Sequence, residues 1–150
     1  MTYSSATLDQ PLAAGGTVLA AYNTLWDALW RQPYVPAATL ELCRLRLAQL
    51  HRADAELAPA IAHAELAPHK RAALLDGSWS RDTAIAAAER DAIEFAEIYG
   101  QDPAALDDAI SERIKQHYGD KGLISLIEAL GFIDGRIRLG ILLSRMQRVR

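Results

Sequence analysis

The chain contains little cysteine, few aromatic residues and no excess of positive charge. Cys43 is the one cysteine among 150 residues, which excludes an intrachain disulfide and any site built from two thiols of one chain. Aromatic residues make up 7% of the chain and alanine is abundant, so helices are favoured over sheets. The net charge of -3 argues against nucleic acid and anionic membrane surfaces as partners.

Signals for export and for membrane insertion are also missing. The first positively charged side chain is that of Arg31, so we expect no leader peptide with a basic start. The most apolar stretch, residues 123–143, carries four charged side chains: Glu128, Asp134, Arg136 and Arg138. Such charges are costly in a membrane-spanning helix, so we expect a buried core helix here and a cytoplasmic protein.

What the chain does have is a composition typical of a helical domain. Hydrophobic residues make up 51% and charged residues 23%, which is enough for one packed core. We expect residues 1–10 to form a flexible arm and residues 11–150 to form a single all-α domain of six to seven helices. Proline, glycine and capping residues separate the expected helices. These cover approximately residues 12–32, 37–51, 54–64, 68–75, 83–99, 103–118 and 120 onwards.

Gly131 and Gly135 stand four residues apart in the last expected helix. Glycine lets a second helix approach closely, and that helix could belong to another subunit. Local packing within the chain explains the spacing equally well, so both interpretations stay open.

Polar residues that could bind a metal are scattered between positions 51 and 69. They are His51, Asp54, Glu56, His63 and His69. Helical zinc sites commonly pair histidines at positions i and i+4, and no two histidines here have that spacing. We therefore expect surface histidines and a helix cap, with neither a metal nor a cofactor.

Cys43 is the first candidate for reactive chemistry. A reactive thiol usually lies at a helix N-terminus or beside a cation. Cys43 instead falls inside the second expected helix, on the apolar face that includes Leu40 and Leu47. Arg44 and Arg46 are neighbours in sequence but are expected to point elsewhere. The pattern favours a buried, inert cysteine.

Glu41 and Glu56 are the second candidate. Glu41 lies about one turn into the second expected helix, where the helix dipole favours a carboxylate without any function. Alternatively, Glu41 is a general acid or base in a pocket between helices, and Glu56 is its counterpart. The spacing alone does not decide between these interpretations.

The stretch from Glu41 to Glu56 resembles the core of the carboxymuconolactone decarboxylase superfamily, which includes the AhpD-like alkylhydroperoxidases. In the redox branch of that family, a glutamate is followed by a leucine-rich helix that ends in Arg-x-x-Gln-Leu, and then by CxxC and a histidine. Further segments similar to the family are residues 71–75 with Trp79, residues 88–97 and residues 109–139. The resemblance covers about residues 26–143. It implies an AhpD-like helical bundle that forms homo-oligomers, commonly trimers or their multiples.

Residue by residue, the resemblance matches Glu41 with the glutamate that relays protons in the family. The two motif cysteines fall on Ala53 and Glu56, and the motif histidine falls on Ala60. Peroxide reduction needs a thiolate nucleophile and a second thiol to resolve the sulfenic acid, and neither Ala53 nor Glu56 supplies one. The resemblance therefore implies a degenerate thiol-peroxidase site in a redox-inactive protein that keeps the scaffold and a pocket for a small molecule.

An acid/base enzyme of the decarboxylase (lyase) type remains open as an alternative, with Glu41 and Glu56 as its two carboxylates. The decarboxylase branch lacks CxxC, and residues 52–57 loosely resemble its sequence at this point. That branch expects a histidine where Ala60 stands, so His63 would have to act from about one helical turn further on. Such a reaction needs a proton donor and a cation for the substrate carboxylate.

A one-cysteine peroxidase is the third interpretation. Cys43 would then react with the peroxide, and an external thiol would act as the resolving partner. Cys43 lies ten residues upstream of the first motif position, so the resemblance itself gives it no role.

Overall fold

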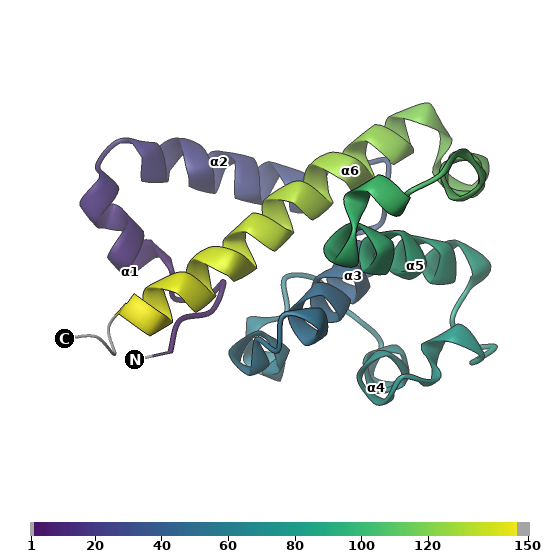
Figure 1. Cartoon of the computed structure of the whole chain (residues 1–150), viewed down its shortest axis with the longest axis horizontal. Helices are drawn as coiled ribbons and strands as arrows, with labels where there is room; N and C mark the ends of the chain where they lie inside the picture. The colour runs from purple at the N-terminus through teal and green to yellow at the C-terminus, as the bar shows by residue number, and fades with distance from the viewer. Residues whose placement is uncertain (1, 147–150) are drawn as a thin grey trace.

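The computed structural model describes residues 2–146, and this part of the chain is helical without strands. Its α-helices are α1 (Asp9–Leu12), α2 (Val18–Arg31), α3 (Ala37–Leu50), α4 (Pro68–Asp76), α5 (Ala87–Gln101) and α6 (Asp108–Met146). The all-α fold class with six to seven helices is therefore confirmed. Figure 1 shows the long α6 crossing the molecule, with α2 on one side of it and α3 and α5 on the other.

The central helix is α3, and its middle part is buried on every side. It packs against α2, α4, α5 and α6. Every residue from Thr39 to Leu45 is buried, including the charged Glu41 and Arg44. One hydrophobic cluster joins α3 to α2, α5 and α6, and a second joins it to α4 and α5. A helix that is buried on all sides has no polar face. The buried surface of α3 is therefore wider than the single apolar face predicted from the sequence.

Residues 54–64, predicted as a helix, form only the 3₁₀ turns η2 (Asp54–Leu57) and η3 (Pro59–Ile61). The prediction is wrong because Ala58 is extended, with φ −65° and ψ 135°, as residues that precede a proline tend to be. Pro59 also lacks the N–H that a continuous helix would need. The chain therefore folds back over α3 instead of running on as a rigid helix.

The helix predicted from about residue 103 begins later than expected, because Asp102 caps only a short turn. Its carboxylate accepts a hydrogen bond from the backbone N–H of Ala104 at 3.1 Å. The result is the 3₁₀ turn η5 (Pro103–Ala105), and α6 begins only at Asp108.

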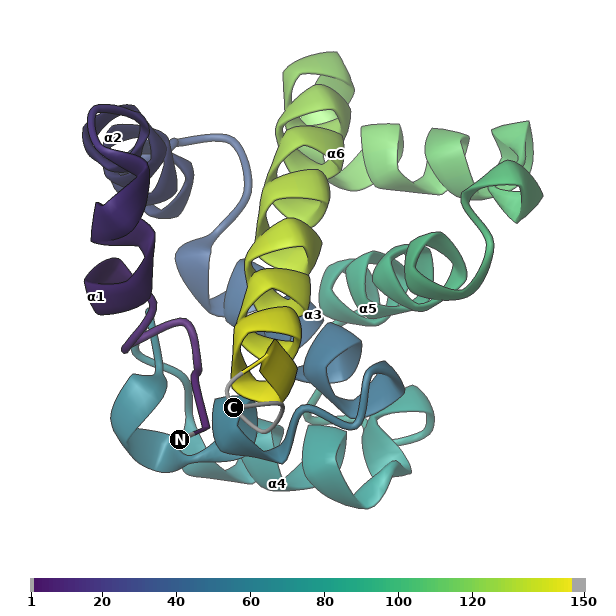
Figure 2. The same ribbon diagram turned by 60° about the vertical axis from the view of Figure 1, so that its left-hand side comes forward.

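Helix α6 changes direction at Gly119, whose φ of +75° lies outside the helical region. Glycine adopts such a φ readily because it has no Cβ. Figure 2 shows the two arms of α6, residues 108–118 and 120–146, running in clearly different directions. The predicted boundary between two helices at this point is confirmed. Neither arm of α6 nor any other described helix has the length and apolar character needed to cross a membrane.

The N-terminal segment predicted as a flexible arm is packed against the domain. Ser5 is 2% exposed and Leu8 is fully buried. The backbone N–H of Tyr3 donates to Oγ of Ser144 on α6 at 2.7 Å. Gly140 makes room for this approach, because a Cβ at that position would lie 3.2 Å from the carbonyl oxygen of Tyr3. These contacts fix the N-terminal segment against the domain. Its polar sequence does not predict them.

Gly131 and Gly135 lie on the second arm of α6. A Cβ at Gly131 would lie 3.7 Å from Oη of Tyr99, an ordinary contact, and a Cβ at Gly135 would meet nothing within 4 Å. Close helix packing within the described chain therefore does not require glycine at either position.

Candidate functional site

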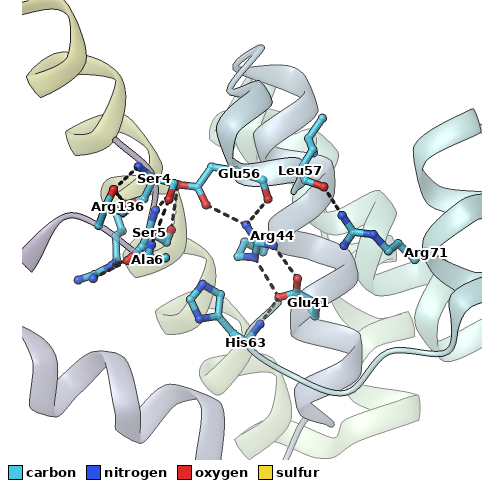
Figure 3. A network of polar contacts seen from close by, with 11 residues as sticks. Ser4, Ser5, Ala6, Glu41, Arg44, Glu56, Leu57, His63, Arg71 and Arg136 are labelled. Atoms are coloured by element: carbon cyan, nitrogen blue, oxygen red, sulfur yellow. Dashed lines mark hydrogen bonds and ion pairs between the residues drawn. The ribbon is translucent and has the colours of Figure 1, made fainter. Parts of the chain in front are cut away.

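Arg44 lies at the centre of a buried cluster of ion pairs (Figure 3). Its Nε and Nη2 donate to the two carboxylate oxygens of Glu41 at 2.9 and 2.6 Å. Its Nη1 donates to Oε2 of Glu56 at 2.8 Å and to the backbone carbonyl of Glu56 at 2.9 Å. The side chains of Arg44 and Glu41 are 0% exposed and that of Glu56 is 2% exposed. Two-point contacts of this kind are among the strong hydrogen bonds of proteins.

The local sequence explains how these three side chains meet. Glu41 and Arg44 are three residues apart on α3 and therefore share a face of the helix. After α3 ends, Arg52 adopts a φ of 54°, which turns the chain back on itself. The N–H of Ala53 then donates to the carbonyl of Ala48 at 2.8 Å. This turn leads into η2 and places Glu56 opposite Arg44.

Two further segments complete the hydrogen bonding of the carboxylates. The backbone N–H and Oγ of Ser5 both donate to Oε1 of Glu56, at 2.6 and 3.0 Å. The backbone N–H of His63 donates to Oε2 of Glu41 at 3.4 Å. Each carboxylate oxygen of Glu41 and Glu56 therefore accepts at least one hydrogen bond, as buried charges require.

The structure brings Glu41 and Glu56 into one cluster, as the acid/base interpretation requires, but the guanidinium of Arg44 lies between them. A general base needs an oxygen within hydrogen-bonding reach of the substrate proton. Here both carboxylates are engaged by Arg44 and by backbone donors. The arrangement is suited to joining α3, η2 and the N-terminal segment.

Cys43 is the fully buried thiol that the sequence predicts, and it packs against α5. Its Sγ donates to the backbone carbonyl of Ala92 at 3.4 Å. Burial raises the pKa of the thiol to about 12. A reactive thiol requires the opposite, a pKa lowered by nearby positive charge.

The positions matched with the CxxC motif and with its histidine differ in their burial. Ala53 is half-buried at the edge of the core, and Ala60 is exposed. Ala53 and Glu56 line a cavity of about 320 Å³ together with residues of the N-terminal segment and α6, among them Tyr3 and Ser144. Ala53 and Glu56, which are matched with the two motif cysteines, therefore face the N-terminal segment.

The imidazole of His63 lies among aromatic side chains. Figure 3 shows the ring directed away from the Glu41 carboxylate, toward the side where Ser5 lies. The ring stacks on Trp30 at 4.9 Å between centroids and meets Trp26 edge-on, also at 4.9 Å. Burial lowers the pKa of His63 to about 4, helped by the positive charges of nearby arginines. The ring is therefore neutral at pH 7.

Arg136 on α6 is a second buried arginine. Its Nη2 and Nε donate to the backbone carbonyl of Ser5 at 2.8 and 3.3 Å. Its Nη2 also pairs with Oδ1 of Asp9 at 3.2 Å. The guanidinium lies 4.8 Å from the ring centroid of Trp26 and 5.4 Å from that of Tyr22. Cation–π contacts of this kind favour a desolvated cation.

The residues considered as metal ligands do not gather. Nε2 of His51 lies 2.5 Å from Oδ1 of Asp134, and Arg138 donates to the other oxygen of Asp134 at 2.7 Å. This contact ties the end of α3 to α6. Asp54 and His69 are exposed. Within residues 2–146, no group of three or more histidine, cysteine or acidic side chains is placed to hold a metal ion.

No protein-family model, curated protein or solved structure matches this chain. Its function must therefore be inferred from its own residues and their contacts.

The buried positions of Arg44 and Arg136 are not among the features predicted from the sequence. Arg44 does have a local signal, because it stands among leucines, three residues after Glu41, in a helix without a polar face. Arg136 has none, because its partners Ser5 and Asp9 precede it by 127 residues or more.

Proposed function

We propose that the protein is a redox-inactive member of the carboxymuconolactone decarboxylase superfamily, with an AhpD-like scaffold that binds a small molecule. The observation that carries the proposal is the buried ion pair between Glu56 and Arg44. By the resemblance, Glu56 stands where the second motif cysteine would be. Its carboxylate stabilises the packing of η2 against α3, a structural role in place of a redox one.

The burial of Cys43 supports the absence of thiol chemistry, and alkylation by iodoacetamide tests it. We expect the folded protein to react at least about 100-fold more slowly than the unfolded protein, because little thiolate forms and the sulfur is enclosed. Equal rates in the folded and unfolded protein would overturn this part of the proposal.

A groove between α2 and α6 supports the binding of a small molecule. Its volume is about 580 Å³, and it is lined by Leu25, Leu29 and Phe132, with Gln32 and Glu128 among its polar groups. Mostly apolar sites with a few polar groups, of this size, are typical of ligand pockets. The proposed ligand is therefore largely apolar.

The fluorescent probe 8-anilinonaphthalene-1-sulfonate tests this groove. Ala28 lines the groove, so Ala28→Trp is expected to fill it and weaken binding of the probe. Ala20→Trp makes the same change at another exposed position of α2 and should leave binding intact. Equal binding to both variants and the wild type would show that the groove does not hold the probe.

The lyase alternative has one observation in its favour, which is that Glu41 and Glu56 do meet in a single buried cluster. Proton transfer would require one carboxylate to leave Arg44 and face a substrate. The contacts therefore support a structural role for the pair more than a catalytic one. Decarboxylation of a lactone acid by the wild type, and its loss in Glu41→Gln, would reverse this preference.

We also propose that the protein is cytoplasmic, as its sequence predicts, and that it forms a homo-oligomer, a trimer or a multiple of it, as the resemblance implies. The outer face of α6 supports this, because Ile124 and Leu142 are each 54% exposed. Gly131 and Gly135 lie between them on the same face, which favours a subunit contact over local packing. Light scattering coupled to size exclusion tests the mass, and Ile124→Asp should reduce it. A monomeric wild type would overturn the proposal.

A further inference from the structure

Ser5 lies between a buried carboxylate and a buried guanidinium and contacts both with its own backbone (Figure 3). Its N–H and Oγ donate to Oε1 of Glu56 at 2.6 and 3.0 Å. Its carbonyl oxygen accepts from Nη2 and Nε of Arg136 at 2.8 and 3.3 Å. The N–Cα–C=O unit of a single residue therefore spans the distance between the two charged side chains.

A free α-amino acid has this same unit, with an ammonium group in place of the peptide N–H and a carboxylate in place of the carbonyl. An ammonium group on Glu56 and a carboxylate on Arg136 would form charge-assisted bonds, which are stronger than the bonds of neutral peptide groups. The ligand carries no net charge, so it leaves the charge balance of the buried cluster unchanged.

Arg136 also retains a donor that Ser5 does not use. Its Nη1 is buried and has no hydrogen-bond partner among the described residues, and its side chain is 4% exposed. A carbonyl offers one oxygen, whereas a carboxylate offers two and can bind an arginine at two points. Since an unsatisfied buried donor is costly, a carboxylate that reaches Nη1 gains a contact that the peptide lacks.

The place of Ser5 in the chain makes its exchange feasible. It belongs to the segment that precedes α1, so the departure of this segment would break none of the longer helices. The cavity of about 320 Å³ lined by Glu56 lies alongside, and Thr2 and Tyr3 of the same segment form part of its wall. Movement of the segment would therefore enlarge this cavity beside Glu56.

We propose that the N-terminal segment is an internal ligand that closes an α-amino-acid site, in which Glu56 binds the ammonium group and Arg136 binds the carboxylate. This inference goes beyond the proposed function, because it assigns a polar ligand to a site separate from the groove between α2 and α6. It does not depend on that groove being occupied.

Calorimetric titration of the full-length protein with glycine and L-serine tests the proposal. Both amino acids should bind saturably, and N-acetylglycine and glycinamide, which lack the ammonium and the carboxylate respectively, should not. Binding should also speed hydrogen exchange in residues 2–8, because Ser5 leaves its partners. Absence of binding by both amino acids, or equal binding by N-acetylglycine, would overturn the site.

Variants of the N-terminal segment test whether Ser5 competes with an amino acid for the site or only holds the segment in place. Ser5→Ala removes the Oγ contact with Glu56 but keeps both charged side chains, so glycine should bind several-fold more tightly than to the wild type. Ser4→Ala is the matched control, because Oγ of Ser4 accepts from the N–H of Ala6 and contacts neither charged group. If both variants bind glycine as the wild type does, Ser5 is not a competitor. If no amino acid binds but the groove between α2 and α6 still binds the fluorescent probe, this inference is wrong and the proposed function is unaffected.

Discussion

The guanidinium of Arg44 and the carboxylate of Glu56 lie 2.8 Å apart, and both are almost completely buried. Arg44 is held at the same time by both oxygens of Glu41. The pair therefore connects the middle of α3 to the turn that follows it. Because neither charge can reach water, each depends on the other, and this dependence can be measured.

Removal of Arg44 should destabilise the protein strongly. Arg44→Gln leaves two buried carboxylates without their cation, and the loss of one partner from a buried ion pair costs about 3–5 kcal/mol. Arg113→Gln is the matched control, because Arg113 also has two acidic partners, Asp91 and Glu94, but is 44% exposed. Its loss should cost less than about 1 kcal/mol. Urea unfolding of both variants measures the difference, and equal losses would contradict the buried network.

The half-buried His63 should make the stability of the protein depend on pH. Its pKa of about 4 in the folded protein lies below its ordinary value of 6.5, so the unfolded chain binds more protons between these values. Its stabilising contribution is therefore complete above pH 6.5 and is lost as the pH falls toward 4. His63→Phe keeps an aromatic ring between Trp26 and Trp30 but cannot titrate, so its stability should fall less over this range. Denaturant unfolding at pH 7, 5.5 and 4 tests this, and parallel curves for both proteins would contradict it.

Two glycines of α6 should respond oppositely to alanine. Gly119 has a φ of +75°, and a side chain in such a conformation costs about 1–3 kcal/mol, so Gly119→Ala should destabilise the protein. Gly135 is helical with open space around its Cβ position within the chain, so Gly135→Ala should stabilise the dissociated subunit by up to about 1 kcal/mol, measured at a protein concentration too low for association. Thermal unfolding compares the two variants. A Gly119→Ala variant as stable as the wild type would show that the break in α6 does not depend on this residue.

The parts of the fold that could be predicted are those with local signals. The start of α3 follows from Pro36, both ends of α4 follow from Pro68 and Gly77, and the break in α6 follows from Gly119. These residues act through their own backbone conformation, which does not depend on the rest of the chain. Residues 54–64 do not form the predicted helix, because Ala58 takes the extended conformation that a following proline favours.

The parts that could not be predicted depend on contacts between distant residues. The sequence pairs Glu41 with Glu56, but it does not indicate that Arg44 lies between them, because Glu56 reaches Arg44 only through the turn that follows α3. Nothing near Ser5 indicates that it bonds Glu56 and Arg136, which lie 51 and 131 residues further along the chain. The polar sequence of the N-terminal segment therefore predicts a flexible arm, whereas Ser5 and Leu8 are buried.

Turnover of a hydroperoxide in the presence of excess dithiothreitol tests the central claim most directly. The wild-type protein and Cys43→Ser are compared at equal concentration. If Glu56 and Arg44 have replaced the thiol site, and Cys43 is inert as its pKa of about 12 indicates, both proteins should consume peroxide only at the background rate of the thiol. Consumption by the wild type above this background, lost in Cys43→Ser, would contradict the account.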